Sequence, residues 1–297
     1  MFAIRQYEFG PAETLRFEEV PDPQPAENQV LIHVASAGVH LVDTSIRKGA
    51  FGNPELPMTP GREVAGVVTQ GPAEWLGRRV VAHLGMANGG YAEKAVANVE
   101  ALHALPDDVS FDNAVAMIGT GRTTVGILQV AKLTPEDRVL VLSAAGGIGA
   151  LLVQEAWNVG ASVVGLASKG KLEHDYSELD SLEDFTVVFD GVGGEIGDQA
   201  LRALGPGGRI IIYGWASGTS TKVSTEILYR NSLTATVALG PGLLKKGLRP
   251  LETEALQALQ TGRFTPSINQ PFALRDAAKA HEALESRATT GKVVLHP

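Results

Sequence analysis

The 297-residue sequence contains no cysteine, so it can form no disulfide bond and offers no thiolate ligand to a metal ion. No apolar run is long enough to cross a bilayer, and the first residues, MFAIRQYEFGP, contain no apolar signal-peptide core. The net charge of -8 argues against nucleic acid or an anionic membrane as a partner. We therefore expect a soluble, cytoplasmic protein that acts on small molecules.

Several catalytic motifs are also missing. The seven histidines are scattered, without an HExxH motif or another paired spacing that would bind a metal ion. No GxSxG motif and no Ser/His/Asp set is evident, which leaves hydrolase chemistry with little support. We expect no metal site.

One stretch, residues 137–161, has the pattern of a dinucleotide-binding turn. Val139–Leu142 is a short apolar run typical of a buried strand, a loop of small residues follows, and the helical spacing after it ends at Gly160. The start of that helix offers unpaired N–H groups and a positive dipole end to a pyrophosphate. In the Ala144-x-Gly146-x-x-Gly149 pattern, Gly146 admits the phosphates and Gly149 lets the helix pack closely. The residues predicted to contact the pyrophosphate are Ala144, Gly146, Gly147, Ile148 and Gly149.

The chain around this turn alternates between strands and helices. Further strands are predicted at 162–167, 186–190, 209–213 and 233–239, with a helix at 196–204. This alternation predicts an α/β domain with a doubly wound parallel sheet.

The first third of the chain is different. Strands predicted at 29–35, 63–70 and 79–84 are separated by many glycines, which indicates a β-rich, partly open barrel. A helix is expected at 114–130. The tail contains two helical stretches and a last strand, 292–295, which needs a sheet to pair with and so rejoins the first domain. We predict one domain at 1–115, completed by 250–297, and a second at 116–249.

The end of the second predicted strand bears on the choice of dinucleotide. An enzyme that prefers NAD usually has an acidic residue there to bind the ribose 2′-hydroxyl. Here the strand ends in Ser168 and Lys169, and the first acid is Glu173. A serine and a lysine favour a 2′-phosphate, so we predict NADP(H). The alternative is that Lys169 and Lys171 are ordinary solvated loop lysines.

An ordered set of motifs covers nearly the whole chain: ASAGVHLVDTSIRKG at 35–49, PGREVAGVV at 60–68, GGYAEKAVA at 89–97, GRTTVGIL at 121–128, AAGGIG at 144–149, FDGVGG at 189–194, GGRIIIYGWASG at 207–218 and ESRATTGKVVL at 285–295. In this order they resemble the zinc-independent medium-chain dehydrogenase/reductases, in the NADPH:quinone oxidoreductase (zeta-crystallin-like) branch. The resemblance implies a GroES-like substrate domain and a Rossmann domain, with the active site in the cleft between them.

The resemblance also implies roles for individual residues. Thr123 falls near the nicotinamide, and Tyr176 matches a tyrosine beside the adenosine phosphate. Gly191, Tyr213, Gly214 and Trp215 lie at strand ends on the nicotinamide side. Gly291 and Lys292 match a segment that returns to the active site. A dimer through the edge of the Rossmann sheet is implied as well, and the apolar run 234–239 fits it.

The sequence departs from the family at several positions. His40 replaces an asparagine, and Ser45 replaces a frequent aromatic residue. Zinc-dependent relatives have Gly-His-Glu where this chain has Gly61-Arg62-Glu63, and a guanidinium cannot bind a metal ion. The stretch 169–185 leaves little room for the usual helix, so one face of the sheet is expected to be less covered.

Without zinc to polarise an alcohol, reduction of an electrophilic acceptor is the easier chemistry. We predict an NADPH-dependent reductase of a quinone or an α,β-unsaturated carbonyl. His40 is the candidate proton donor, or else a hydrogen-bonding support for the cofactor. Asp43 is expected to orient its neighbours, and Arg47 and Arg62 are expected to form structural ion pairs. Tyr91 is a weaker candidate for a residue of the active-site cleft. The alternatives are an acyl-thioester enoyl reductase and an NADPH-binding protein with little catalysis.

Overall fold

The computed structural model describes residues 1–240, 247–269 and 271–297. It divides into two compact units, which are described separately. Unit 1 consists of residues 1–119 and 266–297, and unit 2 of residues 120–265. Among the described residues, none of the helices combines the length and the apolar character that a membrane span requires.

Unit 1 is built on a mainly antiparallel sheet, in which only the β13-β14 pair of the described strands is parallel. The order of its main path is β13-β14-β3-β4-β5-β7, β6 also pairs with β3, and β1 and β2 form a separate hairpin. The strands are β1 (Phe2–Gln6), β2 (Leu15–Glu19), β3 (Gln29–Val39), β4 (Glu63–Gln70), β5 (Arg79–His83), β6 (Lys94–Asn98), β7 (Leu102–Ala104), β13 (Phe272–Ala273) and β14 (Val293–His296). The last strand thus rejoins the first part of the chain, as predicted.

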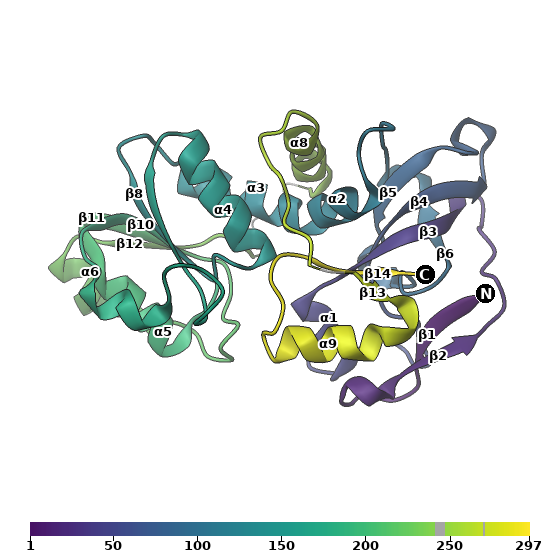
Figure 1. The fold of residues 1–297 in the computed structure, drawn as a ribbon, viewed down its shortest axis with the longest axis horizontal. Coiled ribbons are helices and arrows are strands. Elements are labelled where there is room, and N and C mark those ends of the chain that lie inside the picture. The colour runs from purple at the N-terminus through teal and green to yellow at the C-terminus, as the bar shows by residue number, and fades with distance from the viewer. Residues whose placement is uncertain (241–246, 270) are drawn as a thin grey trace. The chain divides into compact units, whose positions relative to one another are not determined.

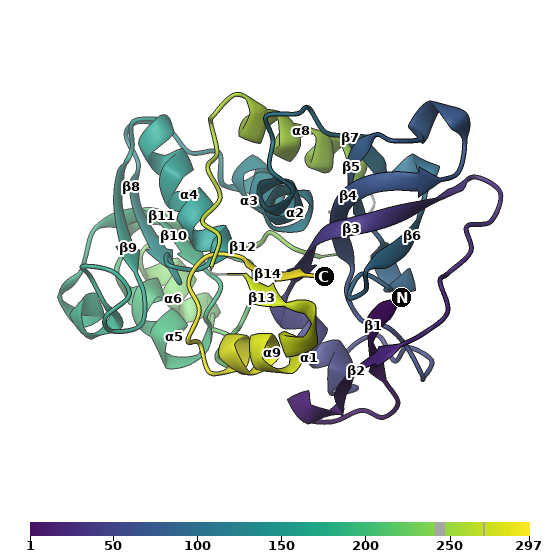
Figure 2. The same ribbon diagram turned by 45° about the vertical axis from the view of Figure 1, so that its right-hand side comes forward.

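The long strand β3 organises unit 1, because it pairs with β4, β6 and β14. Register shifts between Leu31 and Ile32 and between Val34 and Ser36 mark irregular positions that bend it, as a curving sheet requires. The helices of this unit are α1 (Leu41–Arg47), α2 (Phe111–Ala116) and α9 (Ala277–Glu285). Helix α2 packs on β3 and β4, and α1 and α9 lie side by side (Figures 1 and 2).

Unit 2 is a five-stranded parallel sheet in the order β12-β11-β10-β8-β9. The strands are β8 (Arg138–Leu142), β9 (Ser162–Leu166), β10 (Phe185–Asp190), β11 (Leu204–Ile212) and β12 (Thr234–Val237). When the strands are numbered within the unit, the order is the doubly wound 2-1-3-4-5. The chain adds β9 on one side of β8 and then β10 on the other side, so the order of strand addition reverses between β8 and β10. Ligands of such sheets bind outside the carboxyl ends of the strands at that reversal.

Helices cover both faces of this sheet: α3 (Arg122–Ala131) and α4 (Gly147–Asn158) on one, and α5 (Gly194–Arg202) and α6 (Thr225–Arg230) on the other (Figures 1 and 2). Alternate residues of β8 enter the two cores. Val139 and Val141 pack with α3 and α4, whereas Leu140 and Leu142 pack in the core of α5 and α6. Burial on both faces explains why β8 reads as a continuous apolar run.

The connection from β9 to β10, residues 167–184, contains a short 3-10 helix, Tyr176–Ser181, and no α-helix. The short segment predicted there is confirmed. Strand β9 is the last in the sheet order, so these residues return the chain past β8 to reach β10.

Several boundaries differ from the predictions. The helix expected at 114–130 is α2, a π-helical turn at Met117–Gly121, and α3. Helix α5 begins two residues earlier than expected, and β11 begins at Leu204, because that residue already pairs with Phe185 across an irregular register. Helix α8 (Arg249–Gln260) belongs to unit 2, although 250–297 was assigned to the first domain. It packs on α3, and Glu252 bonds Arg122 at 3.0 Å.

Candidate active site

The glycine turn of unit 2 lies at the end of β8, at the reversal point of the sheet. Ser143 adopts a left-handed conformation (φ 57°), and its carbonyl oxygen accepts a hydrogen bond from the N–H of Gly146 at 2.9 Å. Gly146 is the N-cap of α4, and Gly147 and Ile148 follow in its first turn. A Cβ atom on Gly149 would lie 2.2 Å from the oxygen of Ser143, so a side chain here would force the helix away from the turn.

The same turn is attached to the strands beside it. The N–H of Ala144 donates to the carbonyl oxygen of Leu166 in β9 at 2.9 Å, and the Ala144 side chain is buried. The N–H of Ser143 donates to the hydroxyl oxygen of Tyr176 at 3.0 Å. The structure therefore brings Tyr176 to the first residue of the turn.

The loop after β9 carries the residues predicted to contact the 2′-phosphate. Ser168 is half-buried, Lys169 is exposed, and the carbonyl oxygen of Ser168 accepts the N–H of Lys171 at 3.2 Å. The nearby acids are engaged locally. Asp175 accepts hydrogen bonds from the N–H and hydroxyl of Ser177 at 2.8 and 2.6 Å, and Glu178 accepts the N–H of Asp175 at 3.0 Å. These bonds cap the 3-10 helix that begins at Tyr176, so both carboxylates serve to hold Tyr176 in place.

The ends of β10 and β11 carry the remaining predicted residues of unit 2. The Tyr213 ring lies against Gly191, where a Cβ atom would be 2.4 Å from the ring, and its hydroxyl donates to the carbonyl oxygen of Leu142 at 3.3 Å. Burial, and then the charge of Asp190, raises the pKa of Tyr213 far above its usual value, so it remains a phenol. Gly214 is half-buried and Trp215 is 58% exposed.

Asp190, a buried residue that the sequence analysis did not single out, holds the loop after β10. Its Oδ1 accepts the N–H groups of Val192 and Gly193, both at 2.9 Å, and its Oδ2 accepts the hydroxyl of Thr221. Its position as the last residue of an apolar strand, just before Gly191, was the available signal.

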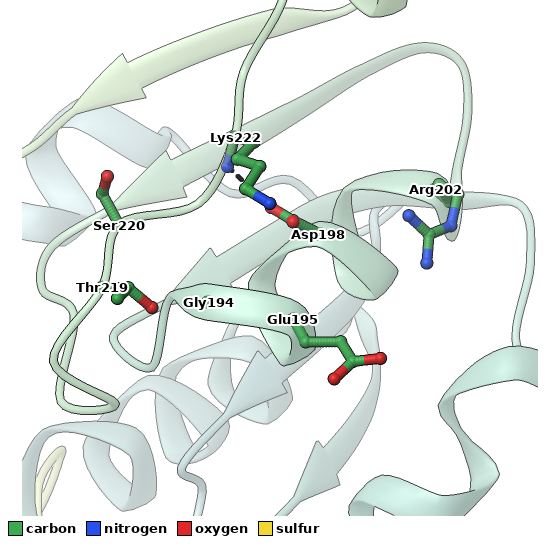
Figure 3. Close-up of a pocket in the computed structure, with 7 residues that line it drawn as sticks. All are labelled: Gly194, Glu195, Asp198, Arg202, Thr219, Ser220 and Lys222. Atoms are coloured by element: carbon green, nitrogen blue, oxygen red, sulfur yellow. Dashed lines mark hydrogen bonds between the residues drawn. The ribbon is translucent and has the colours of Figure 1, made fainter.

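A pocket of about 490 Å³ opens at the start of α5 (Figure 3). Its charged lining residues are Glu195, Asp198, Arg202 and Lys222, and the main-chain N–H of Lys222 donates to Asp198 at 2.6 Å. None of the residues predicted to contact the dinucleotide lines this pocket. Because its two carboxylates balance its two cations, it is a poor match for an anionic nucleotide.

In unit 1, His40 and Asp43 meet at the start of α1. The main-chain N–H of His40 donates to Oδ2 of Asp43 at 2.8 Å, and Oδ1 of Asp43 accepts Nε of Arg62 at 3.2 Å. Asp43 is 3% exposed. Its carboxylate holds the main chain at His40 and pairs with the Arg62 guanidinium, which forms a structural ion pair. Among the described residues, no three His, Asp or Glu side chains gather as candidate metal ligands.

The imidazole of His40 contacts a residue that the sequence analysis did not propose as part of the site. Nε2 of His40 lies 2.5 Å from Oε1 of Glu63, and Oε2 of Glu63 accepts Nζ of Lys292 at 2.7 Å. Burial opposes ionisation of Glu63, but the charges of His40 and Lys292 outweigh it and hold the pKa of this carboxyl well below its usual range. Lys292 is 4% exposed, so its ammonium serves Glu63. Gly291 precedes it with a positive φ of 65°, where a Cβ atom would lie 2.3 Å from the Ser267 oxygen.

A chain of buried hydrogen bonds continues from Asp43 to α9. The hydroxyl of Tyr91 donates to Oδ2 of Asp43 at 3.2 Å and lies 3.1 Å from Nε2 of His281. Nδ1 of His281 lies 3.2 Å from Nη1 of Arg47, which also donates through Nη2 to Glu285 at 2.8 Å. Because a guanidinium only donates, Nδ1 accepts, Nε2 carries the proton, and every bond in the chain runs toward Asp43. Arg47 is thus a structural ion-pair residue, as expected.

The structure therefore gathers the predicted site residues into two sets, each within one unit. In unit 1, His40 and Lys292 contact Glu63, and Asp43 contacts Arg62. In unit 2, the glycine turn, Tyr176 and the strand-end residues lie at the carboxyl edge of the sheet. Thr123 is half-buried in the first turn of α3. Little in the sequence indicated that Glu63 and His281 belong to the site. Glu63 was considered as the last residue of a zinc-type motif, and a lone histidine in a helix does not indicate a site.

Comparison with known proteins agrees with this arrangement. A model of the alcohol dehydrogenase GroES-like domain matches residues 26–107, and a zinc-binding dehydrogenase model matches residues 160–295. The chain is 32% identical to the quinone oxidoreductase of Pseudomonas aeruginosa, with 97% of each chain covered. It is 30% identical to that of Sus scrofa, with 99% of this chain and 97% of the relative covered. The chain belongs to the quinone oxidoreductase family of medium-chain dehydrogenase/reductases.

Solved structures of this family share the fold. The Escherichia coli quinone oxidoreductase complexed with NADPH superimposes with a TM-score of 0.86 at 28% identity, and the Thermus thermophilus enzyme, also solved as its NADPH complex, with 0.84 at 30%. Both comparisons cover all of each chain. The predicted GroES-like and Rossmann-type units are confirmed. The sequence alignments run over 316 and 328 residues, more than the 297 of this chain, so its relatives contain segments that it lacks.

Proposed function

We propose that this protein is an NADPH-dependent reductase that transfers a hydride to a quinone or an α,β-unsaturated carbonyl, without zinc. The observation that carries the proposal is the glycine turn at the reversal of a parallel sheet, followed by a second strand that ends in Ser168 and Lys169. Family membership supports the same reaction, because relatives that are alike over their whole length are named quinone oxidoreductases, and the Escherichia coli and Thermus thermophilus enzymes were solved with NADPH.

Each part of unit 2 has a task in this proposal. The first N–H groups of α4 bind the pyrophosphate, and the close approach permitted by Gly146 and Gly149 admits it. Lys169 is exposed, and Asp175 and Glu178 of the same loop make their hydrogen bonds within the cap of the 3-10 helix, although the charge of Lys169 also acts on Asp175. An exposed cation that can contact a phosphate favours NADPH over NADH.

NADPH supplies the hydride, and the chain supplies orientation and a proton. The substrate oxygen gains negative charge when it accepts the hydride and requires a donor. His40 is the donor in this proposal, because its side chain is 24% exposed whereas Asp43, Glu63 and Lys292 are buried. Arg62 occupies the position of the zinc-ligating histidine of the zinc-dependent relatives and holds Asp43, which supports chemistry without a metal ion.

We further propose that the protein is a cytoplasmic homodimer that pairs through β12. This strand is the last in the sheet order, and its Val237 side chain is 64% exposed. An unpaired apolar edge strand of this kind calls for a cover, and a second copy of the same strand provides one.

The function is tested by mixing the protein with NADPH and a panel of benzoquinone, naphthoquinone, alkenones and a crotonyl thioester, and following the loss of nicotinamide absorbance. Turnover of quinones or alkenones supports the proposal. Turnover of the thioester alone assigns an acyl-thioester enoyl reductase instead. Tight NADPH binding without turnover of any acceptor assigns a binding protein and contradicts the proposal.

The cofactor assignment has its own test. Lys169→Glu should weaken NADPH binding by a factor of about ten or more, because the variant loses one charge-assisted contact with the 2′-phosphate. The binding of NADH, which has no 2′-phosphate, should be almost unchanged. Lys132→Glu, an equal change of charge at an exposed position at the end of α3, is the matched control. Calorimetric titration of both variants with both nucleotides decides it, and an equal loss for NADPH and NADH would contradict the 2′-phosphate contact.

A further inference from the structure

The imidazole of His40 is held by a buried carboxylate that a buried lysine shares. Oε1 of Glu63 contacts Nε2 of His40 at 2.5 Å, and Oε2 contacts Nζ of Lys292 at 2.7 Å. The side chains of Glu63 and Lys292 are 1% and 4% exposed, whereas that of His40 is 24% exposed. Solvent therefore reaches this group of charges through the imidazole.

The chemistry of these groups fixes where the protons are. An ionised carboxylate can only accept a hydrogen bond, so the hydrogen between the ring and Glu63 belongs to Nε2. The ring nitrogen left for exchange with a substrate is then Nδ1. A buried carboxylate on one ring nitrogen sets the tautomer and stabilises the imidazolium, which is the arrangement that general acid–base catalysis by histidine requires.

Other charges face the same ring or its carboxylate from each neighbouring element. Lys292 approaches from the start of β14, and His83 of β5 lies opposite Glu63 in the sheet. Asp43 of α1 binds the main chain of His40 and is itself paired with Arg62. Of these, Lys292 has direct contact with the carboxylate that holds the ring, so it is the group able to offset the charge of Glu63.

Backbone packing keeps the carboxylate from moving. A Cβ atom on Gly119 would lie 1.5 Å from Oε1 of Glu63, and one on Gly38 would lie 2.3 Å from Oε2. Both glycines allow the main chain to approach the two oxygens this closely. Glu63 is therefore confined between backbone segments, and its distances to His40 and Lys292 are set by the fold.

We propose that Glu63 and Lys292 are positioning residues that set the tautomer and the proton affinity of His40, which donates its Nδ1 proton to the substrate. This inference rests on the proposed reductase function. As the acceptor takes the hydride and its two electrons, the Nδ1–H bond breaks and an O–H or C–H bond forms on the reduced product. The neutral ring then takes a proton from water. The negative charge of Glu63 favours the imidazolium form of the ring, and the positive charge of Lys292 opposes it.

The two charges therefore have opposite effects, which can be measured in the protein without cofactor. Nitrogen-15 NMR of labelled histidine reports the tautomer and titration of His40, whose signal is identified by its loss in His40→Asn. Glu63→Gln should lower the His40 midpoint by about one pH unit or more, and Lys292→Met should raise it by a similar amount. The amide introduced by Glu63→Gln should turn its oxygen to Lys292 and its N–H to the ring, which moves the proton of the neutral ring from Nε2 to Nδ1.

Two further variants keep the test decisive. Lys94→Met removes a half-exposed lysine that pairs with Asp22 in the same unit and should leave the His40 titration unchanged. The double variant Glu63→Gln/Lys292→Met removes both buried charges, which protects folding if either single variant is unstable. It should keep the proton on Nε2, because Lys292 no longer competes for the amide oxygen of the new glutamine.

The same variants should shift the pH dependence of quinone turnover. If His40 donates the proton, the rate with NADPH falls at high pH, where the imidazolium is lost. The midpoint of this fall should move to lower pH in Glu63→Gln and to higher pH in Lys292→Met. Midpoints that stay constant or move in the same direction would overturn the inference, as would a proton on Nδ1 in the double variant. If the unmodified protein reduces none of the acceptors, the proposed function fails, whereas the NMR result still decides the roles of Glu63 and Lys292.

Discussion

Acid should destabilise unit 1 through one buried histidine, His281. Its side chain is fully buried, with Nδ1 accepting from Arg47 and Nε2 donating to Tyr91. Burial, helped by the Arg47 charge and opposed by the charge of Asp43, lowers the pKa of His281 to about 4. A second proton would also have to sit on Nδ1 and face the Arg47 guanidinium. The folded protein therefore keeps this ring neutral where an unfolded chain would protonate it.

The size of the effect follows from the two pKa values. An unfolded histidine has a pKa of about 6.5, so between about pH 6.5 and pH 4 the unfolded state binds a proton that the folded state does not. The free energy of unfolding accordingly falls as the pH falls through this window. The loss from this site alone amounts to about 2 kcal/mol at about pH 5 and about 3 kcal/mol at about pH 4, relative to neutral pH.

His281→Gln isolates this contribution, because glutamine can accept from Arg47 and donate to Tyr91 but does not titrate. Trp75 packs against the core of unit 1, so a Trp157→Phe/Trp215→Phe background makes its fluorescence report on that unit. Urea unfolding at about pH 7.5 and about pH 5 gives the acid sensitivity of each form.

The parent with His281 should lose about 2 kcal/mol more than the His281→Gln variant between these two pH values. Any cost of glutamine at neutral pH cancels in this difference. His33→Gln, at an exposed position of β3, is the matched control and should leave the acid sensitivity unchanged. Equal acid sensitivity with histidine or glutamine at position 281 would refute the reasoning.

Three other substitutions test the packing and the edge strand. Gly149→Val should weaken NADPH binding at least about tenfold in calorimetry, since even a Cβ atom lies 2.2 Å from the Ser143 oxygen; unchanged affinity would contradict the close approach of α4. Gly119→Ala should lower the free energy of unfolding of unit 1 by about 1–3 kcal/mol in urea, because the new methyl group displaces the Glu63 carboxylate; a variant as stable as the parent would refute this. Val237→Lys should change stability by less than about 0.5 kcal/mol but convert a dimer to a monomer in light scattering, and a mass that stays dimeric would exclude pairing through β12.

The order of elements in unit 2 was predictable because its signals are local. A run such as VLVL, a turn of small residues and a helix closed by Gly160 predict β8 and α4 without knowledge of the rest of the fold. The start of β11 was missed because the sequence Gly205-Pro-Gly-Gly indicates a turn, whereas pairing of Leu204 with Phe185 draws those residues into the sheet. Pairing between distant segments overrode the local preference.

The site in unit 1 was harder to predict for the same reason. His40 and Asp43 stand out because they are close in sequence and depart from a motif. Their partners lie far along the chain, since Lys292 is 229 residues from Glu63 and His281 is 190 residues from Tyr91. The role of Lys292 changes with that context. By sequence it matched a segment near the cofactor, and in the fold its ammonium contacts a buried carboxylate.

The short connection from β9 to β10 couples order in one segment to ligand binding in another. Through the bond from Ser143 to Tyr176, the 3-10 helix that follows β9 is tied to the turn where the pyrophosphate is proposed to bind. That 3-10 helix packs against α5 and buries Leu179 in the core, so the bond joins the turn to an ordered segment, and opening of the segment should loosen the turn. Protection of its amide protons from exchange with solvent should therefore rise with nucleotide occupancy.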